Sequence, residues 1–130
     1  MAPYTFSPPF LSLAPGEVVK VWNAETPSPG VGGASASQQL ALLRVQTQSG
    51  TPFNVSGFFS GAPGTFEIDV QGSNDDVDTH YNTLNGGQIN TVDSTNNTFN
   101  LQGVQLDTPF VRLLMRTRGN SVAVSAWIGR

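Results

Sequence analysis

The sequence predicts an all-β protein, an antiparallel β-sandwich of jelly-roll or Greek-key type with about eight strands. Short apolar runs with a period of two recur at roughly even spacing, and turns rich in Gly, Pro and Asn separate them. No segment is convincingly helical, and no repeat of fixed length is visible. A chain of 130 residues is long enough for one domain with a single two-layer core.

The first 16 residues predict an extended arm that precedes the sandwich. Four prolines in this segment fix φ and remove backbone donors that a central strand needs. The arm also carries large apolar side chains that we expect to bind a partner: Tyr4, Phe6, Phe10 and Leu11. These side chains either cover an edge of the same sandwich or dock on a neighbouring subunit. We therefore expect an arm over residues 1–16 and a single sandwich domain over residues 17–130.

The sandwich is expected to begin with two strands and a long connection. The valine-rich run Glu17–Asn23 predicts the first strand, and the Pro/Gly/Ser-rich run Thr26–Ser37 predicts a loop. Residues Gln38–Thr47 could form a helix by propensity, but their flanks and a valine near the end favour a strand.

Four strands are predicted in the middle of the chain. Phe53–Phe59 and Thr65–Gln71 are joined by the turn sequence SGAPG, and Thr79–Leu84 follows them. A loop is expected over residues 85–97, before the strand Thr98–Leu106.

The strand Thr65–Gln71 has the period-2 alternation of a half-buried strand. One face is apolar and is expected to enter the core: Phe66, Ile68 and Val70. The other face is polar and is expected to meet solvent: Glu67, Asp69 and Gln71.

A C-terminal hairpin has the strongest strand signal. The alternating runs Pro109–Thr117 and Ser121–Arg130 flank Arg118-Gly119-Asn120, and Gly-Asn favours a tight turn. Four arginines gather near this end of the chain, and we expect them to pair with carboxylates: Arg112, Arg116, Arg118 and Arg130.

The segment FEIDVQGSNDDVDTHY, residues 66–81, concentrates acidic side chains and the only histidine. An EF-hand loop counted from Asn74 would need glycine at its sixth position and glutamate at its twelfth, but Thr79 and Asn85 stand there. A looser calcium site with oxygen ligands from Asp75, Asp76 and Asp78 stays open. The residue types favour a solvated turn between two strands, because Gly, Ser, Asn and Asp cap turns with their own side chains.

The sequence predicts no enzyme and no cofactor. A hydrolase triad would have to use His80, and no Gly-x-Ser-x-Gly elbow is present. One histidine without any cysteine makes a zinc site improbable. A carboxylate pair for glycoside hydrolysis could be drawn only from Glu67 and Asp69, and no other feature supports it.

Aromatic side chains on a sandwich face offer another functional option, stacking on sugar rings. The candidates are Trp22 and Trp127, with Tyr81 and Asn82. For both tryptophans, packing in the core or at a subunit contact is the favoured interpretation, because large aromatics dominate burial there.

Composition argues against several partners. The formal net charge is -3 and Lys20 is the only lysine. This argues against nucleic acid as a partner, because proteins that bind nucleic acid need a basic face. The N-terminal residues lack the pattern of a secretory signal, and no apolar stretch approaches the roughly 18 to 20 residues of a membrane span. We expect synthesis in a cytoplasm and no membrane or small-molecule partner.

Two stretches together suggest a family. GTFEIDVQGSNDDVDTHYNTL, residues 64–84, followed by FVRLLMRTRGNSVAVSAWIGR, residues 110–130, resembles small β-sandwich virion proteins of tailed bacteriophages. The segment DDVDTHY departs from that pattern, in which glycine and tryptophan are frequent, and only strand and turn roles carry over.

The resemblance implies a role in virion construction, and a head decoration or cement protein fits a small domain with an apolar arm best. It implies a location on the capsid surface, the major capsid protein as partner, and a homotrimer at three-fold positions. A head-to-tail or tail component stays open. The alternative is a carbohydrate-binding or tail-adhesion module in which Trp22, Trp127 or Tyr81 stacks on a sugar.

Overall fold

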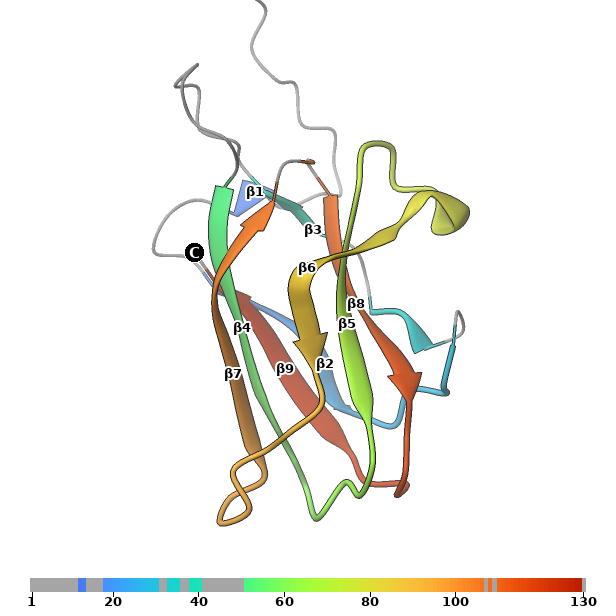
Figure 1. Ribbon diagram of the computed structural model, residues 1–130, viewed down its shortest axis with the longest axis vertical. Coiled ribbons are helices and arrows are strands. Elements are labelled where there is room, and N and C mark those ends of the chain that lie inside the picture. Colours follow the sequence, from blue (N-terminus) through green and yellow to red (C-terminus); the bar gives the residue numbers. More distant parts are fainter. Residues whose placement is uncertain are drawn as a thin grey trace, which may run out of the picture.

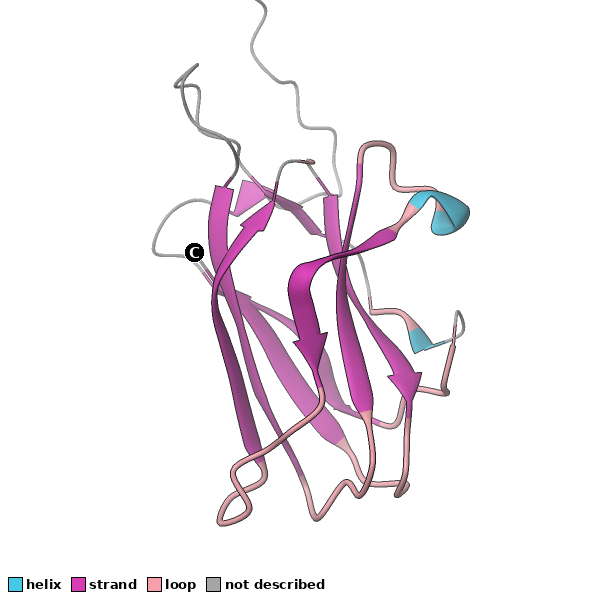
Figure 2. Cartoon of the chain, viewed as in Figure 1, coloured by secondary structure: helices cyan, strands magenta, loops and turns pink. Residues whose placement is uncertain are grey.

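The computed structural model describes residues 12–13, 18–30, 33–35, 38–40, 51–106, 108 and 110–129. Two β-sheets pack face to face in this part of the chain (Figure 1). Strands make up nearly all of its regular structure, and the only helical pieces are short 3-10 turns (Figure 2). The described residues contain no helix long and apolar enough to span a bilayer.

The five-stranded sheet has the order β1-β3-β8-β5-β6. Its strands are β1 (Ser12–Leu13), β3 (Gln38–Leu40), β8 (Phe110–Thr117), β5 (Glu67–Ser73) and β6 (Asn82–Ile89). Neighbouring strands are antiparallel except β1 and β3, which pair in parallel at one edge.

The four-stranded sheet has the order β2-β9-β4-β7, and all its pairs are antiparallel. Its strands are β2 (Val18–Glu25), β9 (Val124–Gly129), β4 (Thr51–Phe59) and β7 (Thr98–Leu106). From β2 to β9 the chain changes sheet at every step except between β5 and β6. Eight strands in the orders β2-β9-β4-β7 and β3-β8-β5-β6 form a jelly roll, which confirms the predicted fold class.

The core lies between the two sheets and is built from alternate residues of their strands. The largest fully buried apolar side chains are Ile68, Leu113, Met115, Ile128, Val55, Val70, Val111 and Val124. Phe59 packs against Phe66 with ring centroids 4.8 Å apart, and against Phe99 at 5.7 Å. The predicted core face of the strand after Gly64 is therefore confirmed.

The predicted exposure of the opposite face of β5 was wrong. Asp69 and Gln71 are buried, and only Glu67 of that face keeps partial exposure. β5 lies between β8 and β6, and polar side chains from these neighbours bond to its outer face. A strand with partners on both sides can bury polar residues once their hydrogen bonds are satisfied.

Several element boundaries also differ from the predictions. Asp78–His80 is a 3-10 turn, so His80 lies before the strand that was expected to contain it. β6 then continues to Ile89, through part of the predicted loop, with Gly86 at a φ of 71°. The last strand begins at Val124 and not at Ser121. Of Gln38–Thr47, residues 38–40 are strand, and residues 41–50 lie outside the described residues.

Candidate functional site

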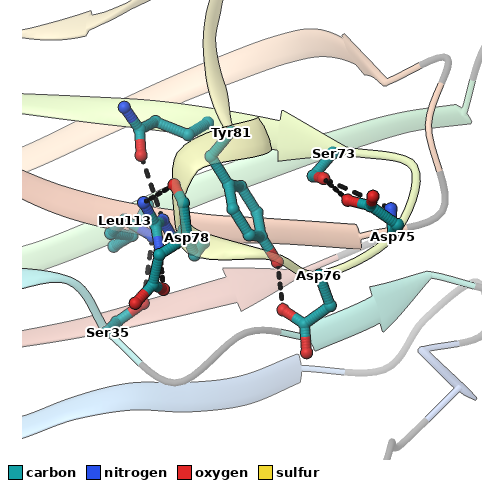
Figure 3. Close-up of polar contacts among 9 residues, drawn as sticks. Ser35, Ser73, Asp75, Asp76, Asp78, Tyr81 and Leu113 are labelled. Atoms are coloured by element: carbon teal, nitrogen blue, oxygen red, sulfur yellow. Dashed lines mark hydrogen bonds and ion pairs between the residues drawn. The ribbon is translucent and has the colours of Figure 1, made fainter.

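The acidic segment between β5 and β6 is a loop held by side-chain contacts (Figure 3). Asp75 accepts a hydrogen bond from the Ser73 hydroxyl at 3.1 Å, and its other oxygen lies 2.6 Å from His80 Nδ1. Asp76 accepts the Tyr81 hydroxyl at 2.5 Å. The hydrogen bond from His80 lowers the pKa of the Asp75 carboxyl below its ordinary value.

Arg112 of β8 fastens this loop to the sheet. Its side chain is only 5 % exposed, and its Nη1 donates to Asp78 at 2.8 Å. Its Nε donates to Gln71 at 3.0 Å, so one guanidinium joins β8, β5 and the loop. The Tyr81 ring stacks on the same guanidinium and is buried.

The three candidate calcium ligands therefore bond to different protein side chains and share none of them. Asp75 engages Ser73 and His80, whereas Asp76 and Asp78 engage Tyr81 and Arg112. Within the described ranges no three His, Asp or Glu side chains gather as a metal ion would require. The geometry agrees with the interpretation of this segment as a turn that its own side chains stabilise.

A second polar cluster lies on the outer face of the same sheet. Asp69 Oδ2 accepts hydrogen bonds from Arg116 Nε and, at 2.9 Å, from the Thr83 hydroxyl. Arg116 also lies 3.5 Å from Glu67. Asp69 Oδ1 is buried and accepts no hydrogen bond from the described residues. The expected pairing of arginines with carboxylates is confirmed for Arg112 and Arg116.

The pKa values of the two carboxyls in this cluster shift in opposite directions. A hydrogen bond shared with Asp69 raises the pKa of Glu67, and burial adds to the rise. Burial also favours the neutral form of Asp69, but hydrogen bonds from Glu67, Arg116 and Thr83 outweigh it and lower its pKa. Asp69 is 1 % exposed, so this pair does not present two carboxylates to a substrate.

The other two arginines have different positions. Arg118 donates to the backbone carbonyls of Thr26 and Pro27, and so fixes the start of the loop after β2. Arg130 lies outside the described residues.

The aromatic candidates divide into buried and exposed residues. Trp22 is 2 % exposed and belongs to the core, and Tyr81 is covered by the Arg112 contact, so neither offers a free ring face. Trp127 projects from the outer face of the four-stranded sheet and stays partly exposed. Its ring centroid lies 5.8 Å from that of Phe58, and the Lys20 amine lies 4.9 Å from the centre of the indole.

A hollow of about 500 Å³ opens beside these two rings. It is lined by Ser56, Gly57, Phe58, Asp93, Thr98, Phe99, Asn100 and Trp127. The strand register explains the grouping, because Trp127 faces Ser56 across β9 and β4, and Ser56 faces Asn100 across β4 and β7.

Phe58 was not predicted from the sequence as a stacking residue, and neither were the polar residues that line the hollow. Phe58 is 41 % exposed, unlike its neighbour Phe59, which lies in the core. The parity of β4 carries the signal: Phe53, Val55 and Phe59 point inward, so Phe58 points outward.

The predicted partner-binding residues Tyr4, Phe6, Phe10 and Leu11 lie outside the described residues. Of the predicted arm, the structure describes Ser12 and Leu13, which pair with Gln39 and Leu40. This end of the arm therefore lies along the β3 edge of the five-stranded sheet.

Comparisons with protein-family models, with curated proteins and with solved structures found no significant match to this chain. The resemblance to phage virion proteins stays a prediction.

Proposed function

We propose that this chain is a structural virion protein of a tailed bacteriophage, a capsid decoration protein that bridges subunits of the major capsid protein on the outer surface. The jelly-roll topology supports the proposal because viral capsid domains use this architecture. Lectin domains use it as well, and a fold by itself assigns no function.

The observation that carries the proposal is the position of β1. Ser12 and Leu13 pair in parallel with β3 at the edge of the five-stranded sheet. Sheet edges present unpaired backbone groups, and extended segments bind proteins by adding a strand to such an edge. β1 covers the β3 edge of the chain's own sheet, and we infer that the apolar side chains preceding it in the sequence contact a neighbouring subunit: Tyr4, Phe6, Phe10 and Leu11.

The two polar clusters around Arg112 and Arg116 are consistent with a structural role for the sandwich domain. Arg112 and Arg116 bond to acidic side chains of their own sheet and its loop, which stabilises the fold. A homotrimer around a three-fold position of the capsid completes the proposal, since closed symmetry also hides sheet edges.

Truncation of the arm tests this function. The full chain, co-expressed with the major capsid protein of the genome that encodes it, should sediment with assembled particles. Alone, it should have a native mass three times the 13.8 kDa of one chain. A chain that begins at Glu17 should keep a cooperative thermal transition but leave the particle fraction.

Substitution within the arm provides the matched comparison. Changing Tyr4, Phe6 and Phe10 to serine keeps the arm's length and prolines and should release the protein from particles as the truncation does. Full decoration by the truncated chain would show that the arm hypothesis is wrong. A stable monomer that binds no particle would overturn the decoration role as a whole.

One observation favours a second candidate function, a carbohydrate-binding or tail-adhesion module. Phe58 and Trp127 expose aromatic rings beside a hollow with polar walls. Trp22 and Tyr81, the other predicted stacking residues, are buried and do not contribute.

A further inference from the structure

We propose that the hollow beside Phe58 and Trp127 is a binding site for a neutral pyranose oligosaccharide. The inference rests on the second candidate function and is independent of capsid decoration.

Two aromatic rings lie on the outer face of the four-stranded sheet, beside the hollow. In a jelly roll the outer face of a sheet meets solvent, and most outward side chains of this sheet are polar, as Ser56, Thr98 and Asn100 are. Phe58 and Trp127 rise from this polar surface in contact with each other. The apolar C–H face of a pyranose suits such rings, because one side of the sugar is apolar while its edges carry hydroxyls.

Side chains of two neighbouring strands restrain the Trp127 indole. Trp127 is contacted by Phe58 of β4 and by the Lys20 amine of β2, so neighbouring strands on both sides restrain it. The Lys20 amine also donates to Asn23 at 3.0 Å, in an exposed hydrogen bond. A ring held in place before binding loses little entropy when a ligand arrives.

Polar side chains line the hollow beside the two rings. Asn100 offers an amide with both donors and an acceptor, and Asp93 offers a carboxylate. Asp93 is positioned by its turn: its Oδ1 accepts the Thr95 amide at 3.1 Å, and its backbone amide donates to Thr98 at 2.9 Å. Vicinal sugar hydroxyls need this kind of mixed donor and acceptor set.

Size and charge narrow the ligand class. The hollow's volume of about 500 Å³ falls within the roughly 300–1,000 Å³ of ligand pockets and has room for a short oligosaccharide. Among the described residues that line it, Asp93 is the one ionisable side chain and would repel a uronic or sialic acid, whereas the Lys20 amine lies over the Trp127 indole and outside this lining. A protein partner is less well matched, because the exposed apolar surface here is two rings set among hydroxyl and amide groups.

The test is binding to an array of immobilised neutral pyranose oligosaccharides built from glucose, galactose, mannose and N-acetylglucosamine, with sialylated and uronic acid oligosaccharides alongside. We expect a signal with at least one neutral oligosaccharide, which is then titrated in solution. Phe58→Ala and Trp127→Ala should each weaken its binding by at least about tenfold. Val18→Ala should leave it unchanged, since Val18 is 64 % exposed on the same sheet but does not line the hollow.

Two further variants guard against loss of folding and test specificity. Asn100→Ala changes an exposed side chain on edge strand β7 and should weaken binding severalfold without lowering the melting temperature. Asp93→Asn should reduce the discrimination against acidic oligosaccharides.

Three outcomes would overturn the proposal. One is an array without any signal from a neutral oligosaccharide. Another is a signal that Phe58→Ala and Trp127→Ala leave intact in folded protein. The third is loss of particle association in these two variants with no saccharide binding by the wild type, which would make this face a protein contact.

Discussion

The guanidinium carbon of Arg112 lies 4.0 Å from the centre of the Tyr81 ring, and this contact anchors the acidic loop to the sheet. The same side chain donates to Gln71 on β5 and to Asp78 in the loop. One buried cation therefore joins β8, β5 and the loop between β5 and β6. The composition of the acidic segment suggests a metal site, but in the structure the segment is a loop that connects β5 to β6 and whose side chains contact Arg112.

Arg112→Ala is expected to lower the free energy of unfolding by about 2–4 kcal/mol, because it removes a buried side chain and leaves Gln71 without its donor. The bond to Asp78 accounts for little of this loss, since that carboxylate is 75 % exposed and screened by water. Urea unfolding at pH 7 measures the change. Arg118→Ala is the matched control and should cost less than about 1 kcal/mol, because one of its bonds to backbone carbonyls is exposed and the other is only partly buried. If Arg112→Ala lowered the free energy of unfolding by less than Arg118→Ala does, the anchoring role of Arg112 would be contradicted.

Calcium is expected to leave the melting temperature unchanged. Binding to the folded state would raise stability in proportion to ligand concentration, but Asp75, Asp76 and Asp78 would each have to release a protein partner first. The measurement is a pair of thermal unfolding curves, one in millimolar calcium chloride and one in EDTA. A calcium-dependent rise that Asp75→Asn removes would show that a metal site forms in this loop.

The sequence was enough to predict the sandwich, because the alternation of apolar and polar residues along each strand is a local pattern. The alternation of Phe66, Ile68 and Val70 identifies one face of β5 whatever the neighbouring strands are. The burial of Asp69 on the opposite face could not be predicted in that way. It depends on Arg116, 47 positions away, and on strand order, which local alternation does not contain.

The exposed aromatic face was only partly predictable for the same reason. Residue type made Trp127 and Trp22 equal candidates for stacking on a sugar. Only the packing of β2 and β9 shows that Trp22 is buried and Trp127 is not. Phe58 becomes relevant through its contact with Trp127, a neighbour on another strand. Asp93 and Asn100 also line the hollow, and the Asp93–Thr98 bridge and the pairing of β4 with β7 place them there.

Gly57→Ala is expected to destabilise the four-stranded sheet by about 1–3 kcal/mol, the usual cost of overpacking. A Cβ at this position would lie 2.3 Å from the backbone oxygen of Ser125 and 2.5 Å from Cζ of Phe99. The neighbouring strand β9 would have to shift to make room, because one of the two obstacles is backbone. Chemical denaturation gives the cost.

Gly61→Ala is the matched control for this substitution. Its Cβ would meet Val122 at 3.4 Å, an ordinary contact, so its free energy of unfolding should stay within about 0.5 kcal/mol of the wild type. Equal losses in the two variants would mean that β4 and β9 do not approach as closely at Gly57 as described.

Glu67→Gln is expected to stabilise the protein at pH 7 and to have no effect in acid. The pKa of Glu67 is raised in the folded state by its hydrogen bond with Asp69, so the fold favours the protonated form. The stability that this group contributes is fully present below the unfolded pKa, about 4.3, and is lost as the pH rises through the higher folded value. Glutamine keeps a donor for Asp69 without the charge. Because the Glu67 side chain is 26 % exposed, the gain at pH 7 should be small, about 0.5 kcal/mol.

Urea unfolding of the wild type and of Glu67→Gln between pH 3 and pH 8 measures this difference, which should appear on the alkaline side of the transition and vanish on the acidic side. Glu25→Gln serves as the control, because Glu25 is an exposed glutamate on β2, in the other sheet. A destabilisation of Glu67→Gln at pH 7 would mean that the ionised Glu67 gains more from Arg116, 3.5 Å away, than it loses beside Asp69. The hydrogen bond with Asp69 would then not be the dominant influence on Glu67.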